Sequence, residues 1–277
     1  MKKVLVILTA TLFALPLLGQ KQYVNFDFGG GMQSFFYDLR TGASSTKSLG
    51  VTGELKYVYF FKEHWAAGTG FSMYSYRSKS KLDGVDVHRL YDEYNQLYYD
   101  YKTEYHNWTE KQRLIDAEIP IMAYYETDVT DNASLLFGLG GRVIFPVSYK
   151  YEVTGGFYRT TGYYPDYNLE IDDLPHHGFG MDITHYSGKL SANTGFSLCF
   201  ELDLMYWFDN FALYLGTYGA YGLTDMTEHE QLLRDENQRY NGMLASDQVD
   251  RVSLVNFGFK IGITLPMNRP EGAILGF

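Results

Sequence analysis

The sequence is short of cysteine, of basic clusters and of long apolar runs, and each shortage excludes a class of protein. A single cysteine, Cys199, leaves no intramolecular disulfide to form. Lysine and arginine form no cluster along an acidic chain of net charge −10, which argues against nucleic-acid binding. Beyond residue 18, no apolar run approaches the roughly 18 residues that a membrane-spanning helix needs. A soluble protein and a β-barrel both remain.

The N-terminus has the pattern of a secretory signal peptide. Lys2 and Lys3 precede an apolar run from Val4 to Leu18, and Gly19 supplies a small residue at a plausible cleavage site. The run is too short for a spanning helix, and no cysteine lies near it as a lipoprotein signal would require. We therefore predict a signal peptide at residues 1–19 and an exported domain at residues 20–277. Removing the leader takes away two lysines and no acid, so the net charge falls from −10 to −12.

Aromatic residues are abundant in this chain. They make up 17% of it, with 26 tyrosines and 19 phenylalanines, while glycine numbers 28 and proline only 7. Small soluble domains rarely carry so much tyrosine. Outer-membrane barrels do, because aromatic girdles lie at both membrane interfaces. The composition therefore favours the barrel.

Apolar and polar residues alternate with a period of two in eight segments of the mature sequence. Segment 24–33, for example, places Phe26 and Phe28 on one face and Asn25 and Asp27 on the other. The other segments are 49–59, 65–76, 115–125, 135–149, 193–204, 211–223 and 255–265. Each is long enough for the roughly 9–11 residues of a tilted transmembrane strand. The pattern predicts an all-β fold, a transmembrane antiparallel up-and-down β-barrel of about eight strands.

The connectors between these segments alternate in length. Those after the second, fourth and sixth segments are short, whereas the others are mostly long, at residues 40–47, 77–112, 152–189 and 225–250. Short periplasmic turns and long extracellular loops are typical of outer-membrane barrels. A soluble sandwich has no reason to show this asymmetry, so we predict location in the cell outer membrane.

The polar faces of the segments carry charges interleaved with glycines. Eight strands enclose a space only wide enough for side chains, so opposite charges inside it must pair. We expect a structural network in the lumen, in which Arg142 and Lys260 face the acids. In the alternative interpretation, the charges face water on a soluble sheet. The predicted network consists of Asp27, Glu54, Lys56, Glu118, Arg142, Glu201, Asp203 and Lys260.

The segment Ala117-Glu118-Ile119-Pro120-Ile121, taken with the leader and the charged strand faces, resembles a known family. It is similar to the small outer-membrane β-barrel proteins of Bacteroidota, porin-like barrels without a peptidoglycan-binding domain, whose fourth strand often reads E-I-P-L. The resemblance covers nearly the whole mature chain as a pattern, but only a few residues as a motif. Members include components of secretion apparatus and surface-interaction proteins, so the resemblance implies a barrel without choosing between these roles.

The predicted connector 77–112 combines aromatic rings with acidic neighbours. Rigid rings give a large contact area at low entropy cost, which suits a partner-binding loop for a protein or a glycan. In the alternative, the rings prolong a hairpin above the bilayer or lie at the lipid head groups. The rings are Tyr91, Tyr94, Tyr98, Tyr99, Tyr101, Tyr105 and Trp108.

Two kinds of chemical site are considered and not predicted. Asp172, Asp173, His176 and His177 could hold a divalent metal, but their spacing matches no closed-site pattern, so we predict no metal and no other cofactor. A lipid-modifying enzyme would need a histidine and a nucleophile together at the outer rim. All seven histidines fall in predicted connectors and nothing fixes a triad, so we predict no catalytic residues.

Three functions remain for an integral outer-membrane barrel surrounded by lipid. The first is a structural or interaction protein that presents Tyr-rich acidic loops to an envelope protein or a surface glycan. The second is a narrow porin-like channel, which a lumen filled by charged side chains disfavours. The third is an outer-membrane lipid-modifying enzyme.

Overall fold

The computed structural model describes residues 21–38, 44–182, 186–229, 233 and 240–268 of the 277-residue chain. The predicted signal peptide at residues 1–19 lies outside this part. Within the described residues, no helix has the length and apolar character to cross a membrane. The predicted mature domain is described from Lys21 onward.

The described chain is almost entirely β-strand. The long strands are β1 (Gln22–Phe36), β3 (Leu49–Phe60), β4 (Trp65–Asp92), β5 (Leu97–Thr130), β6 (Ala133–Tyr164), β10 (Gly195–Trp207), β11 (Ala212–Gly222) and β12 (Ser253–Asn268). The short strands are β2 (Ser44–Lys47), β7 (Leu169–Ile171), β8 (Gly180–Asp182) and β9 (Ser187–Lys189). Single 3₁₀ turns are η1 (Pro165–Tyr167), η2 (Pro175–His177) and η3 (Met243–Ala245).

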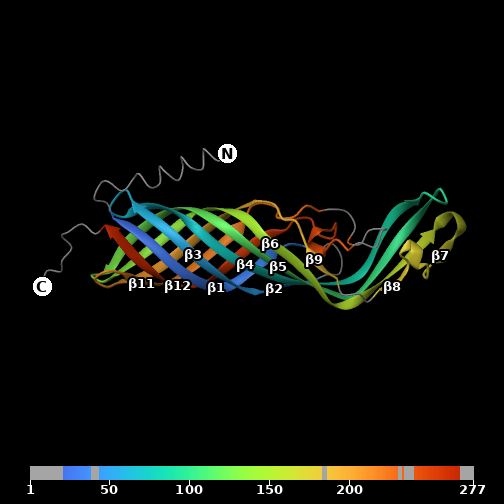
Figure 1. The fold of residues 1–277 in the computed structure, drawn as a ribbon, viewed down its shortest axis with the longest axis horizontal. Helices are drawn as coiled ribbons and strands as arrows, with labels where there is room; N and C mark the ends of the chain where they lie inside the picture. The colour runs from blue at the N-terminus through green and yellow to red at the C-terminus, as the bar shows by residue number, and fades with distance from the viewer. Residues whose placement is uncertain (1–20, 39–43, 183–185, 230–232, 234–239, 269–277) are drawn as a thin grey trace.

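The long strands form a closed antiparallel barrel (Figure 1). Each pairs with its neighbour in chain order, and the last strand returns to the first, as in the pairs Phe28↔Ile261 and Asn25↔Thr264. The predicted antiparallel up-and-down barrel is confirmed. In the described residues the sheet has twelve strands, of which eight form the closed cycle, and the four short strands attach to β4 or β6. The predicted count of eight therefore matches the strands of the cycle and not those of the whole sheet.

Alternation sorts the side chains of every strand in the cycle between an inner and an outer face. The polar set is buried inside, so the alternative in which these charges face water is wrong. Large apolar side chains point outward, and Phe28 is 75% exposed. Together they form a continuous apolar belt around the barrel. Each long strand contributes to this belt. In chain order, one member from each strand is Phe28, Val51, Phe71, Ile121, Leu139, Leu198, Leu215 and Phe259.

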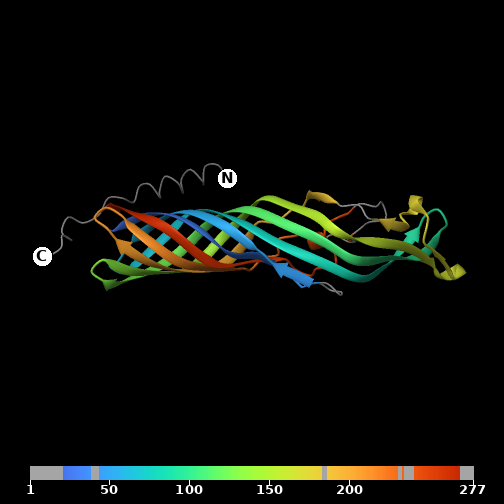
Figure 2. The same ribbon diagram turned by 90° about the horizontal axis from the view of Figure 1, so that it is seen from below.

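The predicted loop at residues 77–112 is wrong, because β4 and β5 continue through it as a paired hairpin. Pairing runs without a long break from Ser78↔Gln112 to Asp92↔Leu97. The predicted loop at 152–189 is likewise partly strand, since β6 extends to Tyr164. These strands project far beyond the rest of the barrel (Figures 1 and 2). They remain regular because inward side chains stay buried along β5 as far as Tyr99 and along β4 as far as Leu82, and those further out on β4 are mostly half-buried.

The connection between β11 and β12 covers the outer end of the lumen. Its described residues Met226, Leu244, Val249 and Val252 are buried in one apolar cluster with Tyr74 and other side chains of the barrel wall. Further out, Leu233 and Met243 are buried against the extended hairpins. The outer half of the lumen is thus filled by this connection.

Candidate functional site

The predicted network lies in the middle of the lumen, on the inward faces of six strands. Lys56 on β3 is at its centre, and its Nζ lies 3.0 Å from Glu54 Oε2, 2.5 Å from Glu201 Oε2 and 3.4 Å from Asp27 Oδ2. Glu201 comes from β10, on the opposite side of the barrel. One ammonium group therefore joins carboxylates from three strands across the lumen.

The other two cations complete the network. Arg142 on β6 lies 3.2 Å from Glu54 Oε1 and 3.3 Å from Glu118 Oε2. Lys260 on β12 lies 3.0 Å from Asp203 Oδ2 and also contacts Glu201. Because five acids meet three bases here, ion pairing alone leaves carboxylate oxygens without a cation.

Tyrosine hydroxyls add hydrogen-bond donors to three of the carboxylates. Tyr74 donates to Glu54 Oε1 at 2.5 Å, Tyr124 donates to Glu201 Oε1 at 2.5 Å, and Tyr214 donates to Asp27 Oδ2 at 2.7 Å. The guanidinium of Arg142 also lies over the Tyr74 ring, 4.9 Å from its centroid. Sequence reasoning missed these tyrosines. Strand parity could have found Tyr124, which is two residues from the inward-facing Met122.

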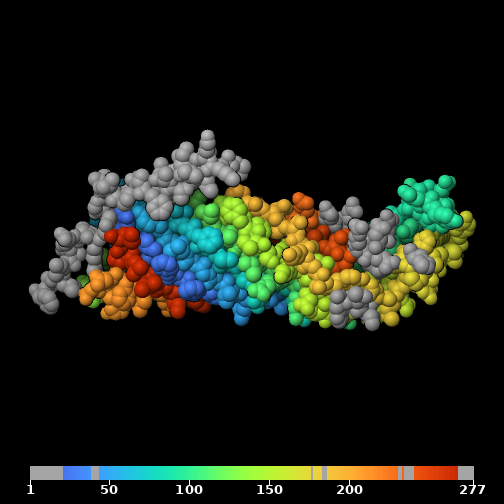
Figure 3. All heavy atoms as spheres, viewed as in Figure 1, coloured from blue at the N-terminus to red at the C-terminus, as the bar shows by residue number. Residues whose placement is uncertain are grey.

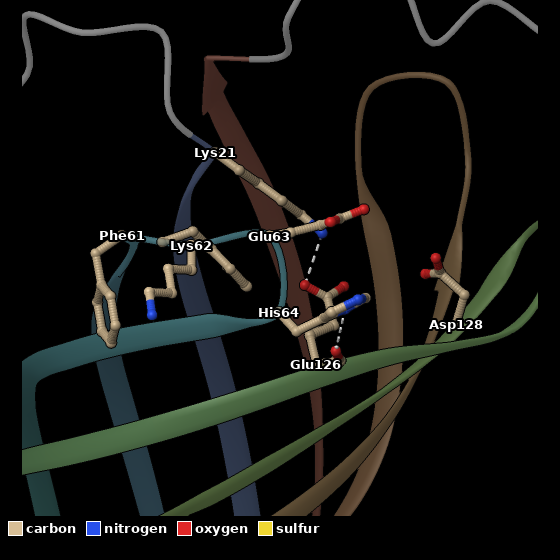
Figure 4. Close-up of a pocket in the computed structure, with 8 residues that line it drawn as sticks. Lys21, Phe61, Lys62, Glu63, His64, Glu126 and Asp128 are labelled. Atoms are coloured by element: carbon tan, nitrogen blue, oxygen red, sulfur yellow. Dashed lines mark hydrogen bonds and ion pairs between the residues drawn. The ribbon is translucent and has the colours of Figure 1, made fainter.

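The inner end of the lumen, on the side of the short turns, is closed by aromatic side chains. Tyr23 lies against Phe60 and Trp207, with ring centroids 5.0 and 5.1 Å apart. Glu126 accepts hydrogen bonds from the Lys21 ammonium at 2.6 Å and from the Tyr23 hydroxyl. Figure 4 shows Lys21 reaching the carboxylate of Glu126 and the turn residue His64 reaching its backbone. This arrangement ties the N-terminal strand to β5 at the barrel end.

The outer end is closed by a buried polar cluster on the β11–β12 connection. Tyr240 donates its hydroxyl to Glu110 Oε2 at 2.6 Å and accepts from Trp108 Nε1 at 3.0 Å. The Met243 backbone N–H also donates to Glu110. These contacts attach the connection to β5. The charged layer therefore lies between an aromatic layer on the inner side and the packed connection on the outer side.

The seven predicted partner-binding rings divide into two groups. Tyr91, Tyr94 and Tyr98 are exposed at the tip of the β4–β5 hairpin, and Tyr94 is 91% exposed. The other four, Tyr99, Tyr101, Tyr105 and Trp108, are buried against β6, its following loop or the β11–β12 connection. Figure 3 shows the two hairpin tips, teal and yellow, forming the narrow far end of the molecule. The aromatic surface open to a partner is thus smaller than predicted, and it lies at the very end of the β4–β5 hairpin.

Of the histidines and acids considered for metal or catalysis, those that the structure describes do not assemble into a catalytic group. Asp172, Asp173 and His177 are exposed around η2, and nothing is described for the side chain of His176. A different trio, Asp86, His88 and Asp247, has ligand atoms within 4.8 Å of one another. The amide of Gln248 donates to Asp86 at 2.7 Å, so one carboxylate oxygen of this trio is already engaged. In the described part of the chain, no histidine is hydrogen-bonded to a serine or cysteine nucleophile.

Neither a protein-family model nor a curated relative matches the sequence. Among solved structures, Neisserial surface protein A has a TM-score of 0.36 at 13% identity, covering 88% of this chain and 96% of that one. The attachment invasion locus protein Ail of Yersinia pestis has a TM-score of 0.30 at 11% identity, covering 90% of this chain and 100% of that one. The outer membrane protein OprG from Pseudomonas aeruginosa has a TM-score of 0.40 at 10% identity, covering 91% of this chain and 98% of that one. At these values the similarities establish neither a family nor a function, and the resemblance to Bacteroidota barrels stays a prediction.

Proposed function

We propose that the chain is an exported integral outer-membrane barrel with a closed lumen, which presents the tip of its extended hairpins to a partner outside the cell. The apolar belt supports the membrane location. A closed sheet satisfies its own backbone groups, and an exposed apolar surface around a whole barrel is stable in lipid and not in water. Along β5 the belt runs from Ile115 to Tyr125, which at roughly 3.4 Å per residue and a tilt of about 40° gives about 26 Å. That height fits the hydrocarbon layer.

The filled lumen favours an interaction protein over the porin-like channel. Charged side chains, their tyrosine donors and two packed ends occupy the interior, so a solute would have to break buried ion pairs to pass. Planar-bilayer recording tests this point. We expect no stable openings from the wild-type barrel, and steady conductance that changes with charge reversal at Arg142 would favour the channel.

The hairpin tip is the observation that carries the interaction role. From Arg113 to Leu97, β5 continues for 17 residues past the belt, on the order of 50 Å along the strand. At its end, Tyr91 and Tyr98 lie with ring centroids 4.9 Å apart and Tyr94 points into solvent. The exposed acid Glu93 adjoins them in the turn, and the guanidinium of Arg89 lies 5.8 Å from the centre of the Tyr98 ring. A rigid stalk that ends in exposed tyrosines suits contact with a protein or a glycan.

Site-specific photo-crosslinking on intact cells tests this role. A photoreactive residue at position 94 should give a discrete adduct, whereas the same residue at position 85, an exposed valine on the side of the stalk, should not. Digestion of the adduct by protease or by glycosidase then identifies the class of partner. Equal adducts at both positions, or none at position 94 in a correctly folded barrel, would overturn the interaction role.

A further inference from the structure

Basic residues that are scattered in the sequence form a row across four neighbouring strands. Arg77 on β4 pairs with Arg113 on β5, Arg113 pairs with Lys150 on β6, and Lys150 pairs with Lys189 on β9. All four side chains are exposed on the outer face. A second pair, Lys79↔Lys111, is on the same outer face two residues further from the belt.

Such an arrangement is unfavourable without an anion. Residues directly opposite each other on antiparallel strands lie about 5 Å apart, and like charges at that spacing repel. Among the described residues, none of the four side chains in the row forms an ion pair with an acid. The acid beside them is Glu152, opposite Lys111 and next to the row. The chain as a whole is acidic, with a net charge of −10, so this local concentration of positive charge is unusual for it.

The position of the row indicates which anion would neutralise it. Arg113 is two residues beyond Ile115, the last outward apolar residue of β5, and Lys150 is three residues beyond the exposed Val147 of β6. The row therefore borders the apolar belt on the side of the long hairpins. An open groove of about 730 Å³ follows it, lined also by Ser187, Gly188 and the single acid Glu152.

We propose that this groove binds the anionic, phosphate-bearing head group of a membrane lipid whose acyl chains lie against the belt. Arginine offers paired donors to phosphate oxygens, lysine adds point charges, and the boundary between belt and stalk is where head groups lie. The inference rests on the proposed membrane location. The inference goes beyond the membrane location, because it specifies the head-group chemistry of a bound lipid and the side of the barrel where that lipid binds.

Lipid retention in native mass spectrometry tests the proposal on the full mature barrel in a neutral detergent. The probes are phosphatidylglycerol and phosphatidylcholine with the same acyl chains. The test variant is Arg113→Gln/Lys150→Gln. The control is Lys102→Gln/Arg159→Gln, which removes one half-buried charge, paired with Glu170, and one exposed charge far out on the same two strands. We expect the wild type to prefer phosphatidylglycerol and the test variant to bind it about 30-fold more weakly. The control should bind as the wild type does.

Several outcomes would overturn the lipid site. These are equal retention of both lipids by the wild type, unchanged affinity in the test variant, or equal weakening in the control. Inorganic phosphate that binds the wild type as tightly as phosphatidylglycerol would point to a free anion and overturn it as well. Heat-modified migration on gels separates the two proposals. A wild type that shows none is not a membrane barrel, whereas a heat-modifiable barrel without lipid preference lacks only the site.

Discussion

Replacing Arg142 by methionine is the sharpest test of the closed lumen. The guanidinium is fully buried and lies 3.2 Å from Glu54 and 3.3 Å from Glu118. Methionine keeps much of the volume but leaves one of those carboxylates with no cation and the other with only Lys56. Removing one partner of a buried ion pair costs about 3–5 kcal/mol, because the remaining charge stays desolvated. We expect Arg142→Met to lower the free energy of unfolding by that amount.

The triple variant Arg142→Met/Glu54→Gln/Glu118→Gln separates charge from packing. It removes the two acids together with their cation, and Lys56 keeps Glu201 and Asp27 as partners. Replacing a whole buried ionic group by neutral side chains of similar size is often neutral or stabilising. We therefore expect the triple variant to recover most of the stability that the single variant loses.

Urea unfolding in detergent micelles measures both variants, with folded and unfolded barrel separated by their migration on cold gels. The midpoint should fall strongly in the single variant and return toward wild type in the triple variant. Losses of equal size would show that Arg142 matters only through its shape. A loss below about 1 kcal/mol in the single variant, as for solvated pairs, would mean a hydrated lumen and would restore the channel interpretation.

Two further predictions concern the connection that covers the outer end of the lumen. The hydrogen bond to Asp86 raises the pKa of His88 above its usual 6.5, so the pair stabilises the fold below that pH and is lost as pH rises through the raised value. Nε2 of His88 also lies 3.7 Å from Asp247 Oδ2 on the connection. Hydrogen exchange of segment 240–252 should therefore be slower near pH 6 than near pH 8 after correction for intrinsic rates. The difference should be less than about 1 kcal/mol, and His88→Gln should abolish it. Tyr240→Phe removes the hydroxyl that donates to Glu110 and should cost about 1–3 kcal/mol of protection in the same segment. Tyr91→Phe at the exposed tip is its control. Equal exchange in the two variants would show that the Tyr240–Glu110 hydrogen bond does not hold the connection in place.

The barrel and its lumen charges could be predicted because a strand has only two faces. Once Phe26 and Phe28 are assigned to the outside, Asp27 must point inward, and the same parity places Glu54, Arg142 and Lys260 in the lumen. Which cation meets which acid depends on strand register and tilt around the whole barrel. That information is not local to any segment, so the central position of Lys56 was not predicted.

A prolonged hairpin was one alternative for residues 77–112, but the sequence did not decide for it, because the outer face changes character while the inner face does not. Beyond Ile115 the outward residues become Arg113 and Lys111, a pattern that normally marks the end of a transmembrane strand. The strand continues because the inward Gln112 and Glu110 are still buried, and they are hydrogen-bonded to Ser80 of β4 and Tyr240 of the connection. Parity also fails where the register shifts between Ile115 and Asp116, which turns Tyr149 of β6 inward although its alternation predicts the outer face.

The extended wall and the β11–β12 connection depend on each other, and this decides how the tip must be tested. A barrel wall that continues past the apolar belt would enclose an empty space. The connection fills that space, and its Tyr240 is hydrogen-bonded to Trp108 and Glu110 of β5. Deleting residues 77–112 would therefore remove the outer parts of β4 and β5 and expose the apolar side of the connection. Any loss of partner binding in such a variant would reflect a damaged barrel. Changes confined to Tyr91, Tyr94 and Tyr98 leave the buried contacts intact, so only they can assign binding to the tip.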